Sequence, residues 1–441
     1  MSLYAGAAKV NITPHVGCWM DGNVREEGSK GIHDPLYARA LLLREDDGPA
    51  FGLVALDVCG FYAPFAAELR GRAAELCDIA PERILTAATH THAGPAFLGI
   101  LGETAGPELV SLVARTAAGA VKMAFDAMRP ARIAWGRGIA EEPVNNRRLR
   151  TADGETHMNW EGLDPDSVAE VLGPVDPEVL TLRVDGDDGL AIASVLNYAL
   201  HPAILAGDNW LYSADWPGYA IRVMEHARGG TGIVLNGATG NVNHINYKRP
   251  NQQRGFYEAW RLGTIVGAAA LVGLLSSDDM VSDAPTGIQS AVERIPGRRF
   301  TSDQVANAQR IVDSATGPIR AQVDGVPEAV FAQELLKLAA RGDYHEDCEI
   351  QALRIGDGAL VSGPFELFVE YQLDLKSRSP LPFTGYVGYA NGYQGYVPTP
   401  RAFEEGGYEP TPSGWSKLAP EAGGMVIDAG LGLIGSLTAE S

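Results

Sequence analysis

Short apolar segments of strand length alternate with segments of helical spacing through most of the chain, and this alternation restricts the fold more than any other feature. Phe51–Leu56 is an apolar run, and residues 64–77 then combine helical spacing with a proline at the start. A second strand-like run follows at residues 84–89. Alternation of this kind is typical of α/β proteins. We therefore predict an α/β fold of mixed sheets with flanking helices.

The same pattern continues into the last third of the chain. Further helices are expected at residues 108–128, 217–227, 254–275, 302–314 and 327–340. Further strands are expected at residues 131–135, 178–184, 191–196, 232–235, 287–294 and, as a pair, 348–361. The composition turns more polar over residues 276–285. We predict one domain over residues 1–441, with residues 276–285 as the candidate boundary between two lobes.

Four of the strand-like segments end in a polar or Gly/Pro-rich loop. These loops begin at Asp57, His90, His201 and Asn236. Loops at strand ends are where α/β sheets place their ligands, because the sheet is rigid and the loop is free to vary. We therefore predict that the four loops meet at one site, and that a metal ion binds there.

The segment His90-Thr91-His92 is the first candidate for metal binding. An extended backbone would place both imidazoles on one side, and neutral imidazole suits zinc. The alternative is a pair of hydrogen-bonded histidines at a strand terminus. His201, before Pro202, is a third candidate ligand or else a turn residue. Glu366 follows a Gly-Pro turn and offers a carboxylate, unless it serves as a helix N-terminal acid.

The charge and the cysteines exclude several classes of function. The formal net charge is −20, which repels nucleic acid and anionic lipid surfaces, so no nucleic-acid partner is expected. An anionic substrate would need a local cation, for which Arg147 and Arg148 are candidates. The four cysteines contain no Cys-x-x-Cys pair, which argues against a disulfide framework or a thiolate zinc site.

Targeting and membrane signals are not visible. The first residues lack a basic region followed by a long apolar run, so a cytoplasmic location is expected. The apolar run at residues 264–275 is shorter than the roughly 20 residues that span a bilayer, so we expect a core helix and no transmembrane segment. The chain has no phosphate-loop motif, no Gly-x-Gly-x-x-Gly after a strand-like run, no His-Glu-x-x-His and no Gly-x-Ser-x-Gly, which argues against kinases, dehydrogenases and serine hydrolases.

Several motifs, spread over nearly the whole chain, resemble those of the neutral/alkaline non-lysosomal ceramidases, with this chain as a shorter, bacterial-type relative. The His-Thr-His-x-Gly-Pro segment and a late Asn-x-Tyr-x-x-Tyr segment, in this order, are the most specific. The motifs are Asn11-Ile12-Thr13-Pro14, Gly31-Ile32-His33-Asp34 with Tyr37-Ala38-Arg39-Ala40, Thr89-His90-Thr91-His92-Ala93-Gly94-Pro95, the segment from Asn197 to Pro202, Ser213-Ala214-Asp215, and the segment from Tyr389 to Thr399.

The resemblance implies a zinc site and a set of catalytic residues. The implied zinc ligands are His90, His201, Glu366 and Tyr396. The residues implied to act in catalysis are His92 as a proton-transfer group, Arg147 near the site, and Tyr408 facing the substrate carbonyl. The resemblance also implies a ceramidase-like catalytic domain, and no C-terminal β-sandwich domain is expected.

One departure from the family pattern bears on the substrate. The family segment Gly-Asp-Val-Ser-Pro-Asn is replaced by Gly240-Asn241-Val242-Asn243-His244-Ile245, so Asn243 stands in place of the family serine. We therefore expect a zinc-dependent hydrolase that uses metal-activated water to cleave the amide bond of a small or lipid-like N-acyl substrate other than ceramide. The alternatives are a zinc hydrolase of an ester or lactone, and a non-catalytic ligand-binding member of the family.

Overall fold

An eight-stranded mixed sheet forms the centre of the computed structural model, which describes residues 2–249, 251–252, 254–276, 279–322 and 325–439. The strand order is β14-β12-β11-β6-β1-β3-β4-β5. The two edge pairs, β12 with β14 and β4 with β5, are parallel, and all other neighbours are antiparallel. The strands are β1 (Leu3–Asn11), β3 (Tyr37–Glu45), β4 (Phe51–Leu56), β5 (Ile84–Ala88), β6 (Arg129–Ile139), β11 (Glu178–Gly186), β12 (Ala191–Tyr198) and β14 (Thr231–Asn236).

A second, four-stranded sheet packs against one face of the first. Its order is β16-β17-β18-β20, with a parallel pair at β18/β20. Side chains from both sheets share one core, in which Leu41 and Leu53 from the large sheet join Leu353 and Leu360 from the small one. The strands are β16 (Thr286–Pro296), β17 (His345–Ile355), β18 (Gly358–Ser362) and β20 (Phe383–Val387).

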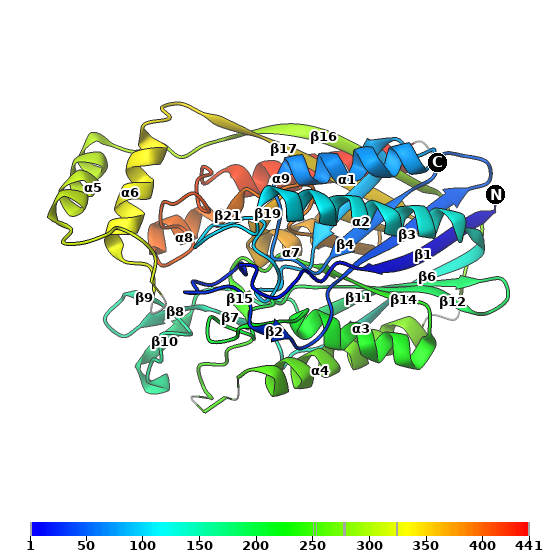
Figure 1. The fold of residues 1–441 in the computed structure, drawn as a ribbon, viewed down its shortest axis with the longest axis horizontal. Coiled ribbons are helices and arrows are strands. Elements are labelled where there is room, and N and C mark those ends of the chain that lie inside the picture. The colour runs from blue at the N-terminus through cyan, green and yellow to red at the C-terminus, as the bar shows by residue number, and fades with distance from the viewer. Residues whose placement is uncertain (1, 250, 253, 277–278, 323–324, 440–441) are drawn as a thin grey trace.

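Helices cover the outer face of each sheet, so the molecule is built in the order helix, sheet, sheet, helix. In Figure 1, α1 and α2 lie along the upper strands of the large sheet and α3 and α4 along the lower ones, and all four pack into the same core, while α5 and α6 project at the end opposite the two termini. α7 and α9 pack on the second sheet. The helices are α1 (Ala63–Leu76), α2 (Pro107–Asp126), α3 (Asp215–Arg228), α4 (Phe256–Leu275), α5 (Ser302–Ser314), α6 (Glu328–Ala339), α7 (Val369–Arg378), α8 (Pro400–Glu405) and α9 (Ala422–Ala439).

Strand β3 shows why the large sheet can be covered on both faces. Successive side chains of a strand point to opposite faces. Ala38, Ala40 and Leu42 lie in the core beneath the helices. Leu41 and Leu43 lie in the core between the sheets. A strand buried on both faces reads as a continuous apolar run, which is the pattern of this segment.

Short strand pairs outside the two sheets hold the loops of the site. Residues far apart in the chain meet in three of them: β2 with β13, β7 with β15, and β19 with β21. A three-stranded sheet, β10-β8-β9, continues from β7. The strands are β2 (Gly31–Ile32), β7 (Asn145–Asn146), β8 (Arg148–Thr151), β9 (Thr156–Met158), β10 (Val168–Val171), β13 (Leu211–Tyr212), β15 (Val242–Asn243), β19 (Phe365–Leu367) and β21 (Gly395–Val397).

The predicted α/β class, with mixed sheets and flanking helices, is confirmed. The strand expected at Phe51–Leu56 has these bounds, and the helix expected at residues 302–314 is α5. The candidate lobe boundary at residues 276–285 lies between α4 and β16, where the chain passes to the second sheet; residues 277–278 are outside the described ranges. A single domain over residues 1–441 without a C-terminal β-sandwich stays a prediction.

Within the described part of the chain, two helices, α4 and α9, are long and apolar enough to cross a membrane, judged by length and composition alone. The same test is passed by core helices of soluble proteins. α4 packs on α3 and on strands β6 and β11, and α9 packs on β16 and β17. The sequence predicted the helix at residues 254–275, which is α4, but no helix was predicted at α9.

Candidate metal centre

Three histidines from two loops bring their Nε2 atoms together in the interior. The distance is 3.2 Å between His90 Nε2 and His201 Nε2, 3.3 Å between His92 Nε2 and His90 Nε2, and 3.1 Å between His201 Nε2 and His92 Nε2. Two nitrogens bound to one tetrahedral zinc ion, each at roughly 2.0 to 2.1 Å, lie about 3.3 Å apart. The spacing of the three nitrogens therefore matches a shared cation.

The hydrogen bond of each Nδ1 atom, the ring nitrogen that points away from the centre, determines whether Nε2 of the same ring can bind a metal. His90 Nδ1 lies 2.5 Å from the Cys59 carbonyl oxygen, and His201 Nδ1 lies 3.3 Å from the Thr239 carbonyl oxygen. A carbonyl oxygen only accepts hydrogen bonds, so each Nδ1 carries the proton and each Nε2 presents a lone pair to the centre. Lone pairs this close repel one another unless a cation lies between them.

His92 differs from the other two histidines in its outer partner. Its Nδ1 lies 3.2 Å from Oδ1 of the Asn23 side chain. The amide group of Asn23 can rotate and then donate to Nδ1 instead of accepting from it. This contact therefore does not determine which ring nitrogen of His92 carries the proton. Gly22 makes room for the ring, since a Cβ atom at that position would lie 2.3 Å from His92 Cγ.

The backbone at His90 explains how the pair converges, and it is not the extended backbone that the sequence suggested. β5 ends at Ala88, and His90 has a φ of 68°, in the left-handed region. The ring stacks on Tyr389 at a centroid distance of 3.8 Å, and the backbone N–H donates to the Val58 carbonyl oxygen. Such a conformation costs about 1 to 3 kcal/mol and is found at functional sites where packing enforces it.

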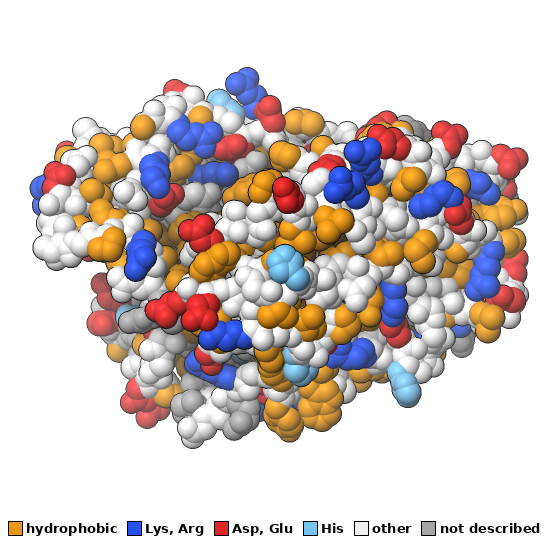
Figure 2. Space-filling view, in the orientation of Figure 1, with side chains coloured by type: hydrophobic (Ala, Val, Ile, Leu, Met, Phe, Trp, Pro, Cys, Tyr) orange, Lys and Arg blue, Asp and Glu red, His pale blue; other side chains and the backbone are white. Residues whose placement is uncertain are grey.

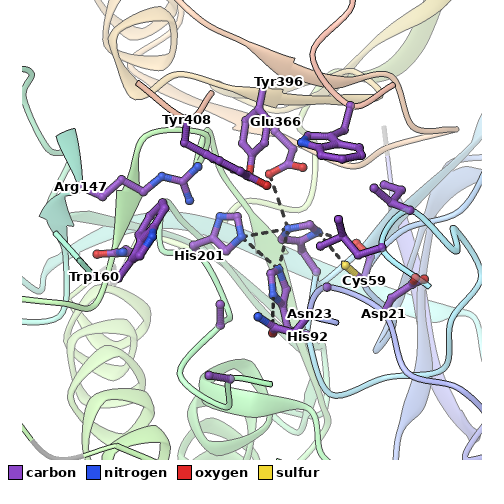
Figure 3. Close-up of a pocket in the computed structure, with 18 of the residues that line it drawn as sticks. Asp21, Asn23, Cys59, His92, Arg147, Trp160, His201, Glu366, Tyr396 and Tyr408 are labelled. Atoms are coloured by element: carbon purple, nitrogen blue, oxygen red, sulfur yellow. Dashed lines mark hydrogen bonds and ion pairs between the residues drawn. The ribbon is translucent and has the colours of Figure 1, made fainter. Parts of the chain in front are cut away.

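Glu366 and Tyr396 enter the centre on a neighbouring strand pair. β19 and β21 run parallel, with Glu366 directly paired to Tyr396. Glu366 Oε2 lies 3.7 Å from His90 Nε2, and the Tyr393 hydroxyl donates to Glu366 Oε1 at 2.5 Å. Figure 3 shows the carboxylate and the Tyr408 ring directed toward the histidines. The register of one short parallel pair thus places both residues at the same centre.

Burial sets the protonation of these groups. It lowers the pKa of His90 to about 3, a shift opposed by the contact with the Cys59 carbonyl, and it lowers the pKa of His92 and His201 well below the usual value. Burial also raises the pKa of Glu366 to about 7, against the contributions of Tyr393 and Arg147. Neutral imidazoles are the form that binds metal.

The donor set fits a zinc ion. It combines imidazole nitrogens with a carboxylate, which is the ligand chemistry of catalytic zinc. Glu366 Oε2 is buried and, within the described part of the chain, receives no well-formed hydrogen bond. A buried carboxylate oxygen in this position is costly unless a cation binds it. His90, His201 and Glu366 also form a group whose candidate ligand atoms all lie within 4.8 Å of one another.

Arg147 lies in the wall of the centre with one nitrogen free. Its Nε donates to Glu409 Oε1 at 2.7 Å, and its guanidinium lies 5.3 Å from the ring centroids of both Trp160 and Tyr396. Burial alone would lower the pKa of Arg147, but Tyr396 and Glu409 more than offset it and raise the pKa. Among the described residues its buried Nη2 has no well-formed hydrogen-bond partner.

Arg148, the other cation proposed for an anionic substrate, has both terminal nitrogens bound elsewhere. Its Nη1 donates to Glu409 Oε2 at 2.9 Å, and its Nη2 donates to the Gly406 carbonyl oxygen and contacts Glu405. The side chain is almost completely buried. Glu409 thus holds both arginines in place, and neither presents a free charge to an incoming carboxylate.

Three polar residues of the sequence motifs and loops could orient a ligand histidine, but they contact no histidine of the centre. Asp57 accepts hydrogen bonds from Arg39 and from the backbone of Tyr37. His33 pairs with Asp34. Asp215 accepts from the backbone N–H of Leu205, which steadies the loop that follows His201. Asn236 instead joins the loops, because its Nδ2 donates to the Thr89 carbonyl oxygen.

The groups that contact the Nδ1 atoms of the three histidines and the Glu366 carboxylate were missed by reasoning from sequence. They are the backbone carbonyl groups of Cys59 and Thr239 and the side chains of Asn23 and Tyr393. Only Tyr393 had a signal, since it lies within the late tyrosine motif. The other contacts involve backbone oxygens or residues from distant loops, which leave no pattern in the sequence.

The metal centre lies within a cavity of about 610 Å³. Trp160, Tyr396, Tyr408 and Trp415 line it near the centre, and Tyr408 contacts both Trp160 and Tyr396 edge to face at a centroid distance of 5.8 Å. Other lining side chains are apolar: Leu98, Ile100, Leu101, Ile204, Ile245, Val326 and Phe331. A cavity with an apolar lining and a few convergent polar groups is typical of a small-molecule site.

Asn243, which replaces the family serine, lines the same cavity but is bound to a neighbour. Its Nδ2 donates to Asn159 Oδ1 at 2.9 Å, and Asn159 Nδ2 donates back to Asn243 Oδ1 at 2.8 Å. The Asn243 oxygen also accepts from the backbone N–H of Ile245. The amide is therefore used for structure.

Comparison with known proteins gives a family and a similar fold. Residues 4–244, more than half of the chain, match the family described as neutral/alkaline non-lysosomal ceramidase, N-terminal. The fold is similar to that of neutral ceramidase from Pseudomonas aeruginosa, with a TM-score of 0.73 and 19% identity over 99% of this chain and 75% of that one. A ceramidase complexed with C2 gives a TM-score of 0.75 and 18% identity, over 100% and 76% of the two chains.

A comparison with curated proteins gives no match. At identities this low the two solved structures establish a shared fold, and the family match establishes membership. The motifs from Asn11 to Pro95 and from Asn197 to Asp215 fall inside the matched region. The chain belongs to the neutral/alkaline non-lysosomal ceramidase family.

Proposed function

We propose that this protein is a zinc-dependent hydrolase that cleaves the amide bond of an N-acyl substrate other than ceramide. The observation that carries the proposal is the convergence of three imidazole Nε2 atoms beside a buried carboxylate in one cavity. Membership of a family named for amide hydrolysis supports the reaction class.

The proposed zinc ligands are His90, His201, Glu366 and Tyr396. The two histidines are the ones whose Nδ1 atoms face backbone carbonyl oxygens, which fixes each Nε2 as an electron-pair donor. When bound, zinc polarises a carbonyl oxygen and lowers the pKa of water to about 7. Tyr393 holds the carboxylate of Glu366 through Oε1 and leaves Oε2 for the ion.

His92 is proposed to move the proton. Its Nε2 lies in contact with both ligand nitrogens, and its Asn23 partner tolerates either position of the proton. It is also the most exposed of the three histidines, at 9% against 2% for His90 and 3% for His201. A proton-transfer group of this kind typically accelerates a reaction by about 10² to 10⁴.

Arg147 and Tyr408 are proposed to stabilise the negative charge that develops on the substrate oxygen. Arg147 offers a buried guanidinium nitrogen without a well-formed partner in the described part of the chain. Tyr408 lines the cavity beside Tyr396. One well-placed donor of this kind contributes about 3 to 4 kcal/mol to transition-state stabilisation.

Asn243 supports the exclusion of ceramide, because the position of the family serine is occupied by an amide that is bonded to Asn159. The proposed mechanism needs no serine side chain. An ester or lactone contains the same polarised carbonyl and is the alternative substrate class.

The proposal is tested by metal analysis and by turnover. Purified protein should contain about one zinc per chain, measured by elemental mass spectrometry before and after chelation, and the His90→Ala variant should contain almost none. The zinc-loaded protein should hydrolyse members of a panel of N-acyl amides and matched esters. No stoichiometric metal after reconstitution contradicts the mechanism. Turnover of esters alone selects the alternative, and no turnover at all favours a binding protein.

A further inference from the structure

The cavity has a second polar region on the loop that follows β15. His244 and Arg254 both line the cavity, ten residues apart on this loop. Gln252 holds the loop together, because its Nε2 donates to the His244 carbonyl oxygen and to Glu258 while its Oε1 accepts from the backbone N–H of Asn246. These contacts tie the start of the loop, at His244, to its end beside Arg254.

Arg254 is the cation of this region. It is exposed, and it forms no ion pair with any described residue. The other lining arginine, Arg147, is bound to Glu409. In a chain with a formal net charge of −20, an arginine without a carboxylate partner at the cavity wall is a binding group for an anion. Basic and acidic side chains are otherwise interspersed on the surface in Figure 2.

His244 supplies the second polar group. It is only 5% exposed, and its buried Nδ1 has no hydrogen-bond partner among the described residues. Burial, with a further contribution from Arg254, lowers the pKa of His244, so the ring is neutral. Proline occupies this position in the family pattern, and proline has no side-chain donor. A buried polar atom without a partner is costly, and a ligand that bonds to it recovers that cost.

The acidic groups of the same cavity do not compete for Arg254. Asp21 accepts hydrogen bonds from the backbone N–H groups of Leu98 and Gly99. Glu366 belongs to the metal centre. Glu258, which lies near His244, is held by two nitrogens of Arg261 at 2.8 Å each. Arg254 is therefore a cation at the cavity wall without a carboxylate partner, and its charge matches a ligand with one negative charge.

We propose that Arg254 and His244 form a subsite for a single carboxylate on the amine half of the substrate. The substrate class is then an N-acylated amino acid. Its acyl chain would lie on the apolar lining formed by residues such as Leu98, Leu101 and Phe331. Hydrolysis breaks the C–N bond, adds the oxygen of water to the carbonyl carbon and returns a proton to the amine. This inference rests on the proposed amide hydrolysis and adds the identity of the leaving half.

A pair of substrates with one acyl chain tests the subsite. An N-acylglycine and the matching N-acylethanolamine share the amide and differ in carrying a carboxylate or a neutral hydroxyl. We expect zinc-loaded protein to cleave the acylglycine with a kcat/KM at least about tenfold higher, and we expect Arg254→Gln to reduce this ratio about tenfold, mainly through KM. Arg249→Gln is the control, because it removes the same charge from the same loop at a residue that pairs with Glu142 outside the cavity.

The outcomes separate the two proposals. Turnover of both substrates without preference, or an unchanged ratio in Arg254→Gln, overturns the carboxylate subsite and leaves amide hydrolysis standing. Absence of turnover for both contradicts the proposed function. In that case calorimetric titration with the same two compounds still tests the subsite, and equal binding of the acylglycine to wild type and to Arg254→Gln would overturn it.

Discussion

The two ends of the cavity are built in different ways. At the metal centre, backbone carbonyl oxygens and strand register fix the reactive side chains, as His90 and the paired residues Glu366 and Tyr396 show. At the far end, side chains hold the loop after β15, as in Asn159, whose Nδ2 donates to Asn243 Oδ1 and to the Ile245 carbonyl oxygen. A centre tied to the backbone tolerates little change, whereas a loop held by side chains can change its specificity one residue at a time.

The largest effect is expected at the centre itself. His201→Ala should abolish zinc binding and reduce activity to background, because it removes an Nε2 donor that its neighbours cannot replace. Elemental mass spectrometry measures the zinc content, and kcat/KM measures the activity. His157→Ala is the matched control, since this half-buried histidine pairs with Glu161 outside the cavity, and the variant should keep both metal and activity.

His92→Ala should separate metal binding from proton transfer. We expect the variant to retain about one zinc per chain and to lose about 10² to 10⁴ in kcat. The reason is that only His90 and His201 have their outer nitrogens bound to backbone carbonyl oxygens. If the variant loses zinc in the same assay, His92 is a third nitrogen ligand and the proton must move through another group.

Tyr393→Phe tests how the carboxylate is held. Removing the hydroxyl that donates to Glu366 Oε1 should weaken zinc binding about 10- to 100-fold, measured by competition with a chelator. Tyr386→Phe is the control, because this tyrosine is equally buried and its hydroxyl has no hydrogen-bond partner in the described ranges. Equal affinities for the two variants would show that Tyr393 does not position Glu366.

The smallest effect is expected on the loop at the far end. Asn159→Ala leaves the amide of Asn243 without its main partner and should lower the free energy of unfolding by about 1 to 3 kcal/mol, measured by urea denaturation. Zinc content should not change. A loss of zinc would show that this pair supports the metal centre as well, and would contradict the separation of the two ends.

Reasoning from sequence found the side chains of the centre but not their geometry. His90, His92 and His201 stood out because polar residues followed apolar strands, Glu366 was a candidate because it follows a Gly-Pro turn, and Tyr396 came from the family resemblance. The extended backbone expected at His90 was wrong, since packing on Tyr389 favours a left-handed conformation that local preference disfavours. Arg147 and Arg148 were named as candidate cations for an anionic substrate, because the sequence does not show that Glu409 binds both.

The sequence by itself determined the alternation of buried strands and helices, the loops that carry polar residues, and the family to which the chain belongs. These features are local: apolar periodicity and short motifs appear directly in the order of residues. Only the tertiary structure decided which nitrogen of each histidine faces the centre, which arginine is left without a carboxylate, and that Asn243 is bound to Asn159. Each of these depends on contacts between residues far apart in the chain, and burial determines their energy.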